Sequence, residues 1–252
     1  MENQLTIIVY APDMVDNDDR PLAVVRGMER AFPGLRLEWT VTDKDKGELV
    51  HLPQRDAWVK HVTEEEESLR FVCNGDENNL VTLWGARLPA SFGPGGKAQS
   101  DFHAALPHNA AGVAAAPAVL EAVAEAARAF WGHATPFNAS VDIVSQIQNL
   151  PTMPEPPRRG LPVLKGPGFR SSPEIPGRLG WLCYWSAAAA RIIGFPDAAR
   201  DAELLSRSRR TASGGWVVQL TDEPLDLDRP EHLDMVKRTY ERFPEIGGRS
   251  TP

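Results

Sequence analysis

The first forty residues carry the pattern that most constrains the fold, because their hydrophobic period changes twice. Leu5–Tyr10 is an apolar run rich in β-branched residues, which favours a buried strand. Pro21 follows two aspartates and opens a segment in which apolar residues recur at helical spacing as far as Phe32. From Leu35 to Val41 apolar and polar residues then alternate strictly, as in a half-buried strand. This stretch therefore predicts strand, helix, strand.

Both kinds of element are expected along the rest of the chain. The apolar spacing and the positions of proline predict helices at 54–62, from Pro117 through Trp131, from Thr135 through Ile147, at 181–193, at 197–207 and from Pro230. Short apolar runs predict further strands at 69–73, 80–84, 101–106 and 216–220.

Residues 151–176 are dense in proline and glycine, and this composition predicts an irregular segment that crosses the surface. The parts on either side of it, 1–150 and 177–252, each carry strands and helices, and neither shows a boundary at which one core would close alone. We therefore expect one large α+β domain over residues 1–252, with a mixed, mainly antiparallel sheet flanked by helices.

Charge and cysteine content narrow the possible partners and the compartment. The 252 residues include 27 Lys and Arg against 34 Asp and Glu, a formal net charge of −7, which disfavours direct binding to nucleic acid. Cys73 and Cys183 are far apart and outside any metal-binding spacing, as expected of reduced thiols in the cytoplasm. The sequence MENQLTIIVY lacks the features of a signal peptide, and no apolar stretch is long enough to span a bilayer. We expect a cytoplasmic protein without a membrane partner.

A search for metal and cofactor sites finds no complete pattern. None of the six histidines falls in an HxH or HExxH arrangement, and His103 and His108, near Asp101, are the closest approach to a ligand pair. The glycine-rich stretch 93–97 lacks the spacing of a phosphate-binding loop. The sequence therefore predicts neither a metal nor a cofactor.

Catalytic machinery is equally hard to assemble from the sequence. No GxSxG elbow occurs, and Asp226 and Asp228 stand just before the helix expected from Pro230, where acidic residues stabilise exposed amides. We expect no catalytic residues and no enzymatic activity. The alternative is a small-molecule hydrolase or transferase that uses His103 and His108 or the carboxylates between Asp222 and Asp228.

Acidic residues gather in three stretches, at 13–19, 64–67 and 222–228. Acidic loops together with seven tryptophans suit recognition of a basic protein, because complementary charge speeds association while aromatic side chains supply affinity. The predicted partner-binding residues are Glu64, Glu65, Glu66, Glu67, Asp222, Glu223, Asp226 and Asp228.

Three segments of the C-terminal third resemble the signature of the immunity protein 52 family of bacterial polymorphic toxin systems. They are GWLCYWSAAAARIIGFPD (Gly180–Asp197), GGWVVQLTDEPLDLDRPEHL (Gly214–Leu233) and YERFPEIGG (Tyr240–Gly248). The segment Tyr10–Trp39 is similar to the opening of a related, largely uncharacterised bacterial family that shares this ending.

The resemblance implies a cytoplasmic antidote, which binds the toxic domain of a protein delivered between competing bacteria. Members of the immunity protein 52 family are associated with nuclease toxins, whose active cleft is basic. The resemblance thus implies that the partner is a cognate toxin, a basic nuclease domain, and that its active site is occluded by this acidic chain. It supplies no binding motif that could be transferred to individual residues.

Overall fold

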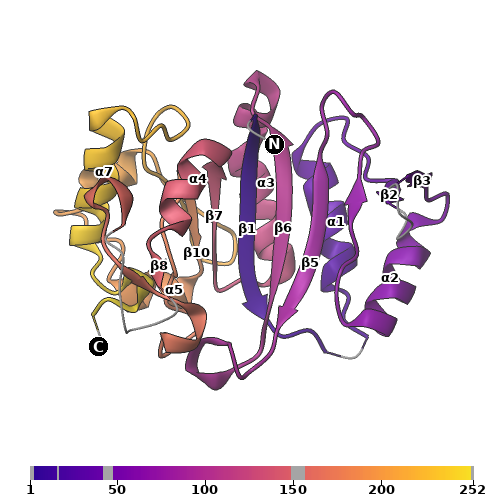
Figure 1. The fold of residues 1–252 in the computed structure, drawn as a ribbon, viewed down its shortest axis with the longest axis horizontal. Helices are drawn as coiled ribbons and strands as arrows, with labels where there is room; N and C mark the ends of the chain where they lie inside the picture. The colour runs from indigo at the N-terminus through magenta and orange to yellow at the C-terminus, as the bar shows by residue number, and fades with distance from the viewer. Residues whose placement is uncertain (1–2, 16, 42–47, 149–156, 251–252) are drawn as a thin grey trace.

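A single ten-stranded sheet runs the length of the molecule (Figure 1). The computed structural model describes residues 3–15, 17–41, 48–148 and 157–250. The strands lie in the order β11-β12-β10-β7-β1-β6-β5-β4-β2-β3, and all neighbours pair antiparallel. Because β10 from the second part pairs with β7 from the first, the sheet joins both parts of the chain, and the expected single α+β domain is confirmed.

The elements have the following bounds. The strands of this sheet are β1 (Gln4–Pro12), β2 (Trp39–Val41), β3 (Leu49–His51), β4 (Val72–Cys73), β5 (Thr82–Leu88), β6 (Gln99–Pro107), β7 (Trp131–Pro136), β10 (Leu182–Trp185), β11 (Arg209–Arg210) and β12 (Trp216–Gln219). A separate parallel pair is formed by β8 (Ile147–Gln148) and β9 (Leu164–Lys165). The helices are α1 (Arg20–Ala31), α2 (Arg55–Glu66), α3 (Ala110–Ala127), α4 (Phe137–Val144), α5 (Ala187–Ile193), α6 (Ala202–Ser206) and α7 (Pro230–Arg242).

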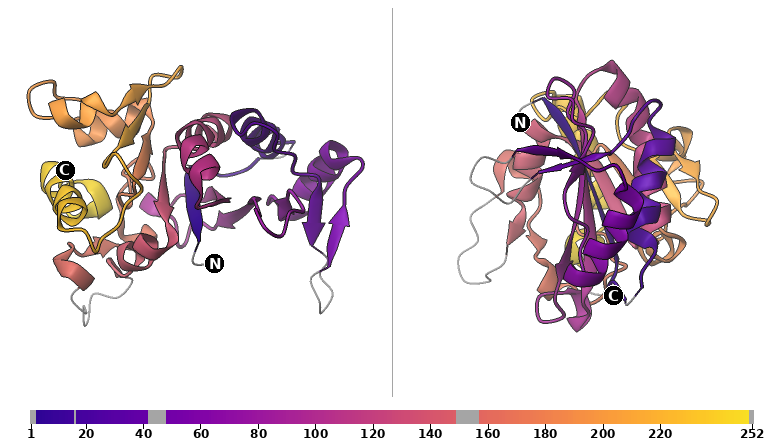
Figure 2. Two further views of the ribbon diagram at one scale, coloured as in Figure 1. Left: turned by 90° about the horizontal axis from the view of Figure 1, so that it is seen from above. Right: turned by 90° about the vertical axis from the view of Figure 1, so that its right-hand side faces the viewer.

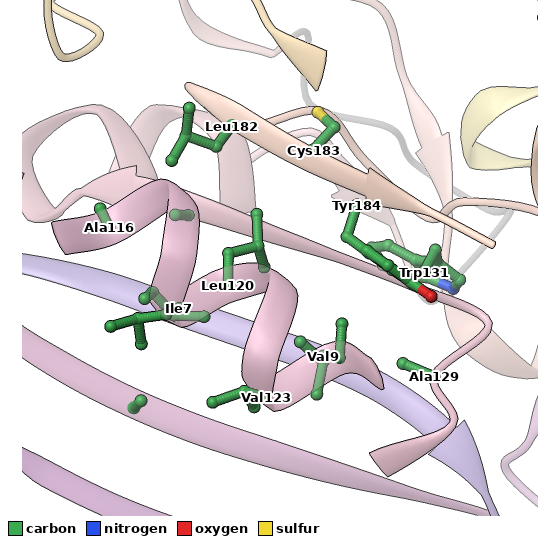
Figure 3. Packing of buried hydrophobic residues seen from close by; sticks show 14 of the residues in the cluster. Ile7, Val9, Ala116, Leu120, Val123, Ala129, Trp131, Leu182, Cys183 and Tyr184 are labelled. Atoms are coloured by element: carbon green, nitrogen blue, oxygen red, sulfur yellow. The ribbon is translucent and has the colours of Figure 1, made fainter. Parts of the chain in front are cut away.

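Helices α1 and α3 cover one face of the sheet, and α2 lies beyond α1 (Figure 2, left). The residues of β1 that point toward α3 are Leu5, Ile7 and Val9, all with no exposed surface. Leu120 and Val123 of α3 meet them in a packed apolar layer (Figure 3). Burial of these side chains supplies the main driving force for packing α3 against the sheet.

Helix α3 begins earlier than the expected start at Pro117. Its N-cap is Asn109, whose side chain accepts a hydrogen bond from the Gly112 amide at 2.9 Å, and Pro117 lies inside the helix. The helix ends at Ala127, so Trp131 belongs to β7 and not to the helix. Among the described residues, α3 alone has the length and apolar composition of a membrane span, but its buried side chains belong to the core.

The apolar run expected to form one helix at 181–193 is divided between two elements. Leu182–Trp185 forms β10, which pairs with β7 and β12 and is buried throughout. Helix α5 starts only after Ser186, whose hydroxyl accepts a hydrogen bond from the Ala189 amide at 3.1 Å. A short run that is apolar on every side fits a buried strand as well as a helix, which explains the wrong prediction.

The proline-rich segment is irregular, as expected, in its described part. Residues 157–181 contain only β9 and two short turns of 3₁₀ helix. They pass across the second face of the sheet, the face opposite α1 and α3, at β7 and β10. Arg170 lies over the Trp131 ring at 5.4 Å, and the Tyr240 hydroxyl of α7 accepts a hydrogen bond from the Leu179 amide at 3.2 Å. Together with α7, this segment covers one part of that face and leaves another part free.

Candidate functional site

The free part of the second face, formed by β1, β6 and β5, is the candidate functional site and is called the open face below. No described helix lies in front of these strands, which are turned toward the viewer in Figure 1. The registers align Ile8 of β1 with His103 of β6, and His103 with Trp84 of β5. An antiparallel sheet with one packed face normally shows polar side chains on the other, so aromatic side chains here need an explanation.

Trp84 and His103 form the centre of the open face. Their rings stack with centroids 3.9 Å apart, and 37% of Trp84 is exposed. His103 Nε2 lies 3.2 Å from a carboxylate oxygen of Asp101, which sits on the same strand two residues earlier. The other Asp101 oxygen, Oδ1, is buried and has no hydrogen-bond partner among the described residues. This combination of a flat aromatic surface with polar atoms is typical of a binding surface.

A polar network borders the open face where the segment 157–181 begins to cover the sheet. Arg178 donates from Nε to Nε2 of His133 at 2.9 Å and from Nη2 to the hydroxyl of Tyr10 at 2.9 Å. Tyr10 stacks on Trp131 with ring centroids 4.1 Å apart. Burial, with a further contribution from Arg178, holds the pKa of His133 well below its usual value, so this imidazole is neutral and accepts the hydrogen bond.

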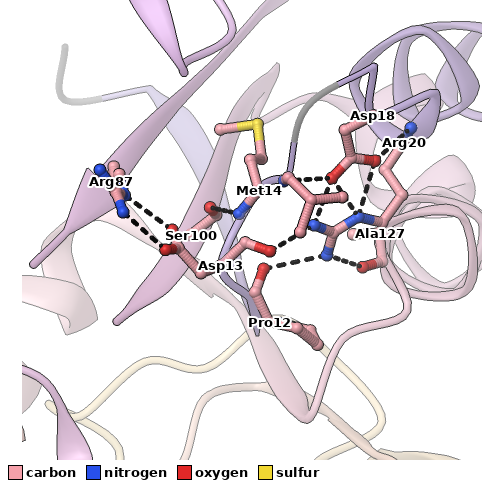
Figure 4. Close-up of polar contacts among 9 residues, drawn as sticks. Pro12, Asp13, Met14, Asp18, Arg20, Arg87, Ser100 and Ala127 are labelled. Carbon is pink, nitrogen blue, oxygen red and sulfur yellow. Dashed lines mark hydrogen bonds and ion pairs between the residues drawn. The ribbon is translucent and has the colours of Figure 1, made fainter. Parts of the chain in front are cut away.

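The acidic stretch 64–67 lies at the end of α2, where three of its side chains contact two arginines and a histidine. Glu66 pairs with Arg70, Glu65 Oε1 lies 3.5 Å from His61 Nε2, and Glu67 Oε2 lies 2.5 Å from Arg87 Nη1. Arg87 also binds Asp13 at 2.8 Å (Figure 4).

A cavity of about 520 Å³ opens beside this stretch. Glu64 and Glu67 line it together with Asp18 and Arg87.

The stretch 222–228 forms the loop between β12 and α7. Glu223 pairs with Arg229, and Asp228 Oδ1 lies 2.9 Å from Arg159 Nη2. Asp226 accepts a hydrogen bond from the Asp228 amide at 3.0 Å. This turn leads into α7, but the N-cap residue of the helix is Arg229 and no side-chain hydrogen bond caps it, so the expected stabilisation of the helix amides by Asp226 and Asp228 is not observed.

The two acidic stretches are not brought together. The stretch 222–228 follows β12 near one end of the strand order, whereas α2 follows β3 at the other end. In Figure 1 α2 and α7 accordingly mark opposite sides of the molecule. The eight acidic residues therefore do not form one continuous patch, and their role in partner binding stays a prediction.

The two histidines of the alternative enzymatic reading are also separated. His103 lies on the open face, while His108 follows β6 and lines a cavity of about 460 Å³. Asp142, Asp226 and Asp228 line the same cavity. Within residues 3–15, 17–41, 48–148 and 157–250, no group of three or more His, Cys, Asp or Glu side chains is placed to hold a metal ion.

The open face and the network that borders it contain residues that the sequence did not single out, namely Tyr10 and Trp84 on the face and Arg178 at its border. A signal for Trp84 was available, because it directly follows the apolar Leu83 in an expected strand, where successive side chains point to opposite faces. Arg178 carries no such signal, since it lies in an irregular segment and meets Tyr10 across 168 positions of sequence.

Comparison with solved structures shows a shared fold. The Pseudomonas aeruginosa T6SS protein PA0821 is similar over 96% of this chain and 74% of its own, with a TM-score of 0.58 and 14% identity. No curated protein matches the chain. The sequence pattern of one family, described as "Domain of unknown function (DUF5953)", matches residues 16–251. This match does not confirm the resemblance to immunity protein 52. Because it spans nearly the whole chain, the protein belongs to the DUF5953 family.

Proposed function

We propose that the protein is a cytoplasmic immunity protein that binds and neutralises a toxin used in competition between bacteria. The observation that carries the proposal is the open face, on which Trp84 stacks on His103 and is 37% exposed. The likeness to a protein described as a T6SS protein supports the same biological setting. The resemblance of the C-terminal segments to immunity protein 52 motivates the finer identification.

Binding in place of catalysis is the function that suits this surface. Aromatic side chains that lie flat on a rigid sheet lose little conformational entropy when a partner covers them, and tryptophan is enriched among residues that dominate binding energy. The neighbouring polar atoms of Asp101 and His103 would fix the orientation of the partner. Both cysteines are free and buried, which fits a reducing compartment.

The proposed partner is a basic toxin domain, and a nuclease suits the charge of the chain. A net charge of −7 attracts a basic protein over a distance of about one Debye length, ~8 Å at physiological salt. The two acidic stretches at opposite ends of the sheet would steer such a partner during approach. The open face between them would supply the affinity once contact is made.

Co-expression tests the proposal directly. Cells that express the toxin encoded beside this gene should survive when the intact protein is present, and purified toxin should form a stable complex with it. The Trp84→Ala variant should protect less, while a variant at an exposed aromatic residue outside the open face, Phe92→Ala, should protect fully. Death of the cells despite soluble, folded protein would overturn the proposal.

The alternative is a small-molecule hydrolase or transferase, and one observation favours it. The cavity of about 460 Å³ brings His108 close to the carboxylates of Asp226 and Asp228, although Asp228 is paired with Arg159. A His108→Ala variant that still protects cells from the toxin would count against this alternative. Loss of a measured hydrolytic activity in the same variant would support it.

A further inference from the structure

Two arginines of the segment 157–181 are buried against the sheet next to the open face. Arg170 is 4% exposed and Arg178 is 8% exposed. Arg178 binds only uncharged atoms, the His133 imidazole and the Tyr10 hydroxyl. Arg170 donates from Nη1 to the carbonyl oxygen of Ile175 at 2.8 Å. Both positive charges are therefore held by neutral acceptors alone.

Neither guanidinium has an acidic partner within the part of the chain that the structure describes. Three other poorly exposed arginines bind a carboxylate: Arg20 binds Asp18, Arg55 binds Glu29, and Arg242 binds Asp201, whereas Arg249 donates only to backbone carbonyl oxygens. A buried charge without a counter-charge is costly, and buried charges in proteins are normally paired. Of the three fully buried arginines in the described part of the chain, Arg20 has a carboxylate partner and Arg170 and Arg178 do not.

Both side chains also keep unused donors. Nη1 of Arg178 and Nη2 of Arg170 make no hydrogen bond with any described residue. Nε of Arg170 is buried and likewise unpartnered. Arg178 binds the Tyr10 hydroxyl and Arg170 lies over the Trp131 ring that stacks on Tyr10, so both charges lie at the same pair of rings. Burial lowers the pKa of Arg170 to about 10, and the charge of Arg178 contributes to the lowering. An anion between them would offset both charges and use the free donors.

We propose that Arg170 and Arg178 form a binding site for a small oxyanion, a carboxylate or a phosphate, which enters from the open face beside Tyr10. The planar guanidinium presents paired N–H groups that match both kinds of oxyanion. The site goes beyond toxin binding and does not depend on it. Asp101, opposite Tyr10 on β6, contacts His103 and forms no ion pair with Arg170 or Arg178.

A purely structural role for the two arginines explains less. Tying the segment 157–181 to Tyr10 and His133 requires hydrogen-bond donors only, and a neutral side chain such as glutamine could supply them. The charge of Arg170 does attract the Trp131 ring beneath it, but Arg178 meets only neutral hydrogen-bond acceptors. The excess of positive charge is what a site for an anion requires.

Calorimetric titration of the full chain with inorganic phosphate, and separately with acetate, tests the site at constant ionic strength. We expect saturable one-to-one binding of at least one anion, weakened about tenfold or more in Arg178→Gln, because a charge-assisted pair of hydrogen bonds is lost. The control Arg87→Gln removes an exposed arginine that has its own carboxylate partners and should bind as the wild type does. Preference for phosphate or for acetate identifies the kind of oxyanion, and either result supports the site. Absence of saturable binding of both anions overturns it, and so does unchanged affinity in folded Arg178→Gln.

A second measurement needs no variant, in case Arg178→Gln fails to fold. Crystals of the wild-type protein grown without oxyanions and then soaked in selenate should show an anomalous peak within hydrogen-bond distance of the Arg170 and Arg178 guanidiniums. Peaks only elsewhere, or none, would refute the proposal. Because both measurements omit the toxin, their failure leaves the proposed immunity function untouched.

Discussion

Trp84 on β5 and His103 on β6 stack almost parallel, with 11° between their ring planes. The register places the two residues directly opposite each other, and Asp101 holds the far nitrogen of the histidine. The stack is therefore fixed by the sheet backbone on one side and by the contact with Asp101 on the other. A partner that docks here meets a rigid surface, which lowers the entropic cost of binding.

Replacement of Trp84 should affect binding far more than stability. We expect Trp84→Ala to weaken toxin binding by about 30-fold, the equivalent of a hot-spot residue worth ~2 kcal/mol. The free energy of unfolding should fall by less than about 2 kcal/mol, because the side chain is partly exposed. Calorimetry with the toxin and urea denaturation measure the two effects. Phe92→Ala, at a more exposed aromatic residue, is the control and should leave the affinity unchanged.

The acidic loop before α7 should act on the rate of association. Asp222→Lys should slow toxin binding at low salt, and the effect should fade as salt is raised, since exposed charges are screened. Glu77→Lys makes the same change in net charge at an exposed site outside the three acidic stretches and provides the comparison. Stopped-flow measurement of the rate of association with the toxin compares the two variants. Equal rates for the two would remove the 222–228 loop from the interface.

Arg20 should be among the residues on which folding depends most. It binds Asp18 and donates to the carbonyl oxygens of Pro12 and Asp13 at 2.9 and 2.7 Å, with both charged side chains almost completely buried (Figure 4). Arg20→Ala leaves an unpaired buried carboxylate and should lower the free energy of unfolding by about 3–5 kcal/mol. Arg87→Ala, which breaks exposed pairs only, should cost about 0–1 kcal/mol. Urea denaturation would contradict this account if the two losses were equal.

His133 should make the protein less stable as the solution becomes acidic. Burial lowers the pKa of His133 in the folded state, so the unfolded chain binds the proton more readily. Where the unfolded state binds more protons, stability rises with pH, and it therefore falls as pH drops below the unfolded pKa of about 6.5. Denaturation of the wild type at about pH 7.5 and about pH 5.5 should show this loss. His133→Gln should reduce the difference between the two pH values, whereas His61→Asn, at a mostly exposed histidine, should not.

Much of the fold could be predicted from periodicity alone. The alternation and helical spacing up to Val41 correctly predicted β1 and α1, although β2 keeps only the last three residues of the expected strand. The helix from Pro230 and the strand at Trp216 were also correct. These elements have one buried and one exposed side, and this contrast is what a hydrophobic pattern records.

The candidate site was largely beyond prediction, for a physical reason. The meeting of Tyr10, His133 and Arg178 depends on strand order and on the path of an irregular segment, and neither leaves a local pattern in the sequence. The acidic stretches were visible as runs of charge, yet their wide separation on the sheet was not. Composition reports how many charges a chain has, whereas their arrangement depends on long-range pairing.

The central position of β1 has a consequence for how the chain is made. On the ribosome β1 emerges well before either neighbour, since Gln4 pairs with Pro107 and Leu5 with Pro136. Until β6 and β7 are synthesised, both edges of an apolar strand stay unpaired, a state that invites association with other chains. Such long-range pairing also makes folding slow. Rapid translation or a prematurely ended chain should therefore favour aggregation, and the cell must protect this strand until its partners arrive.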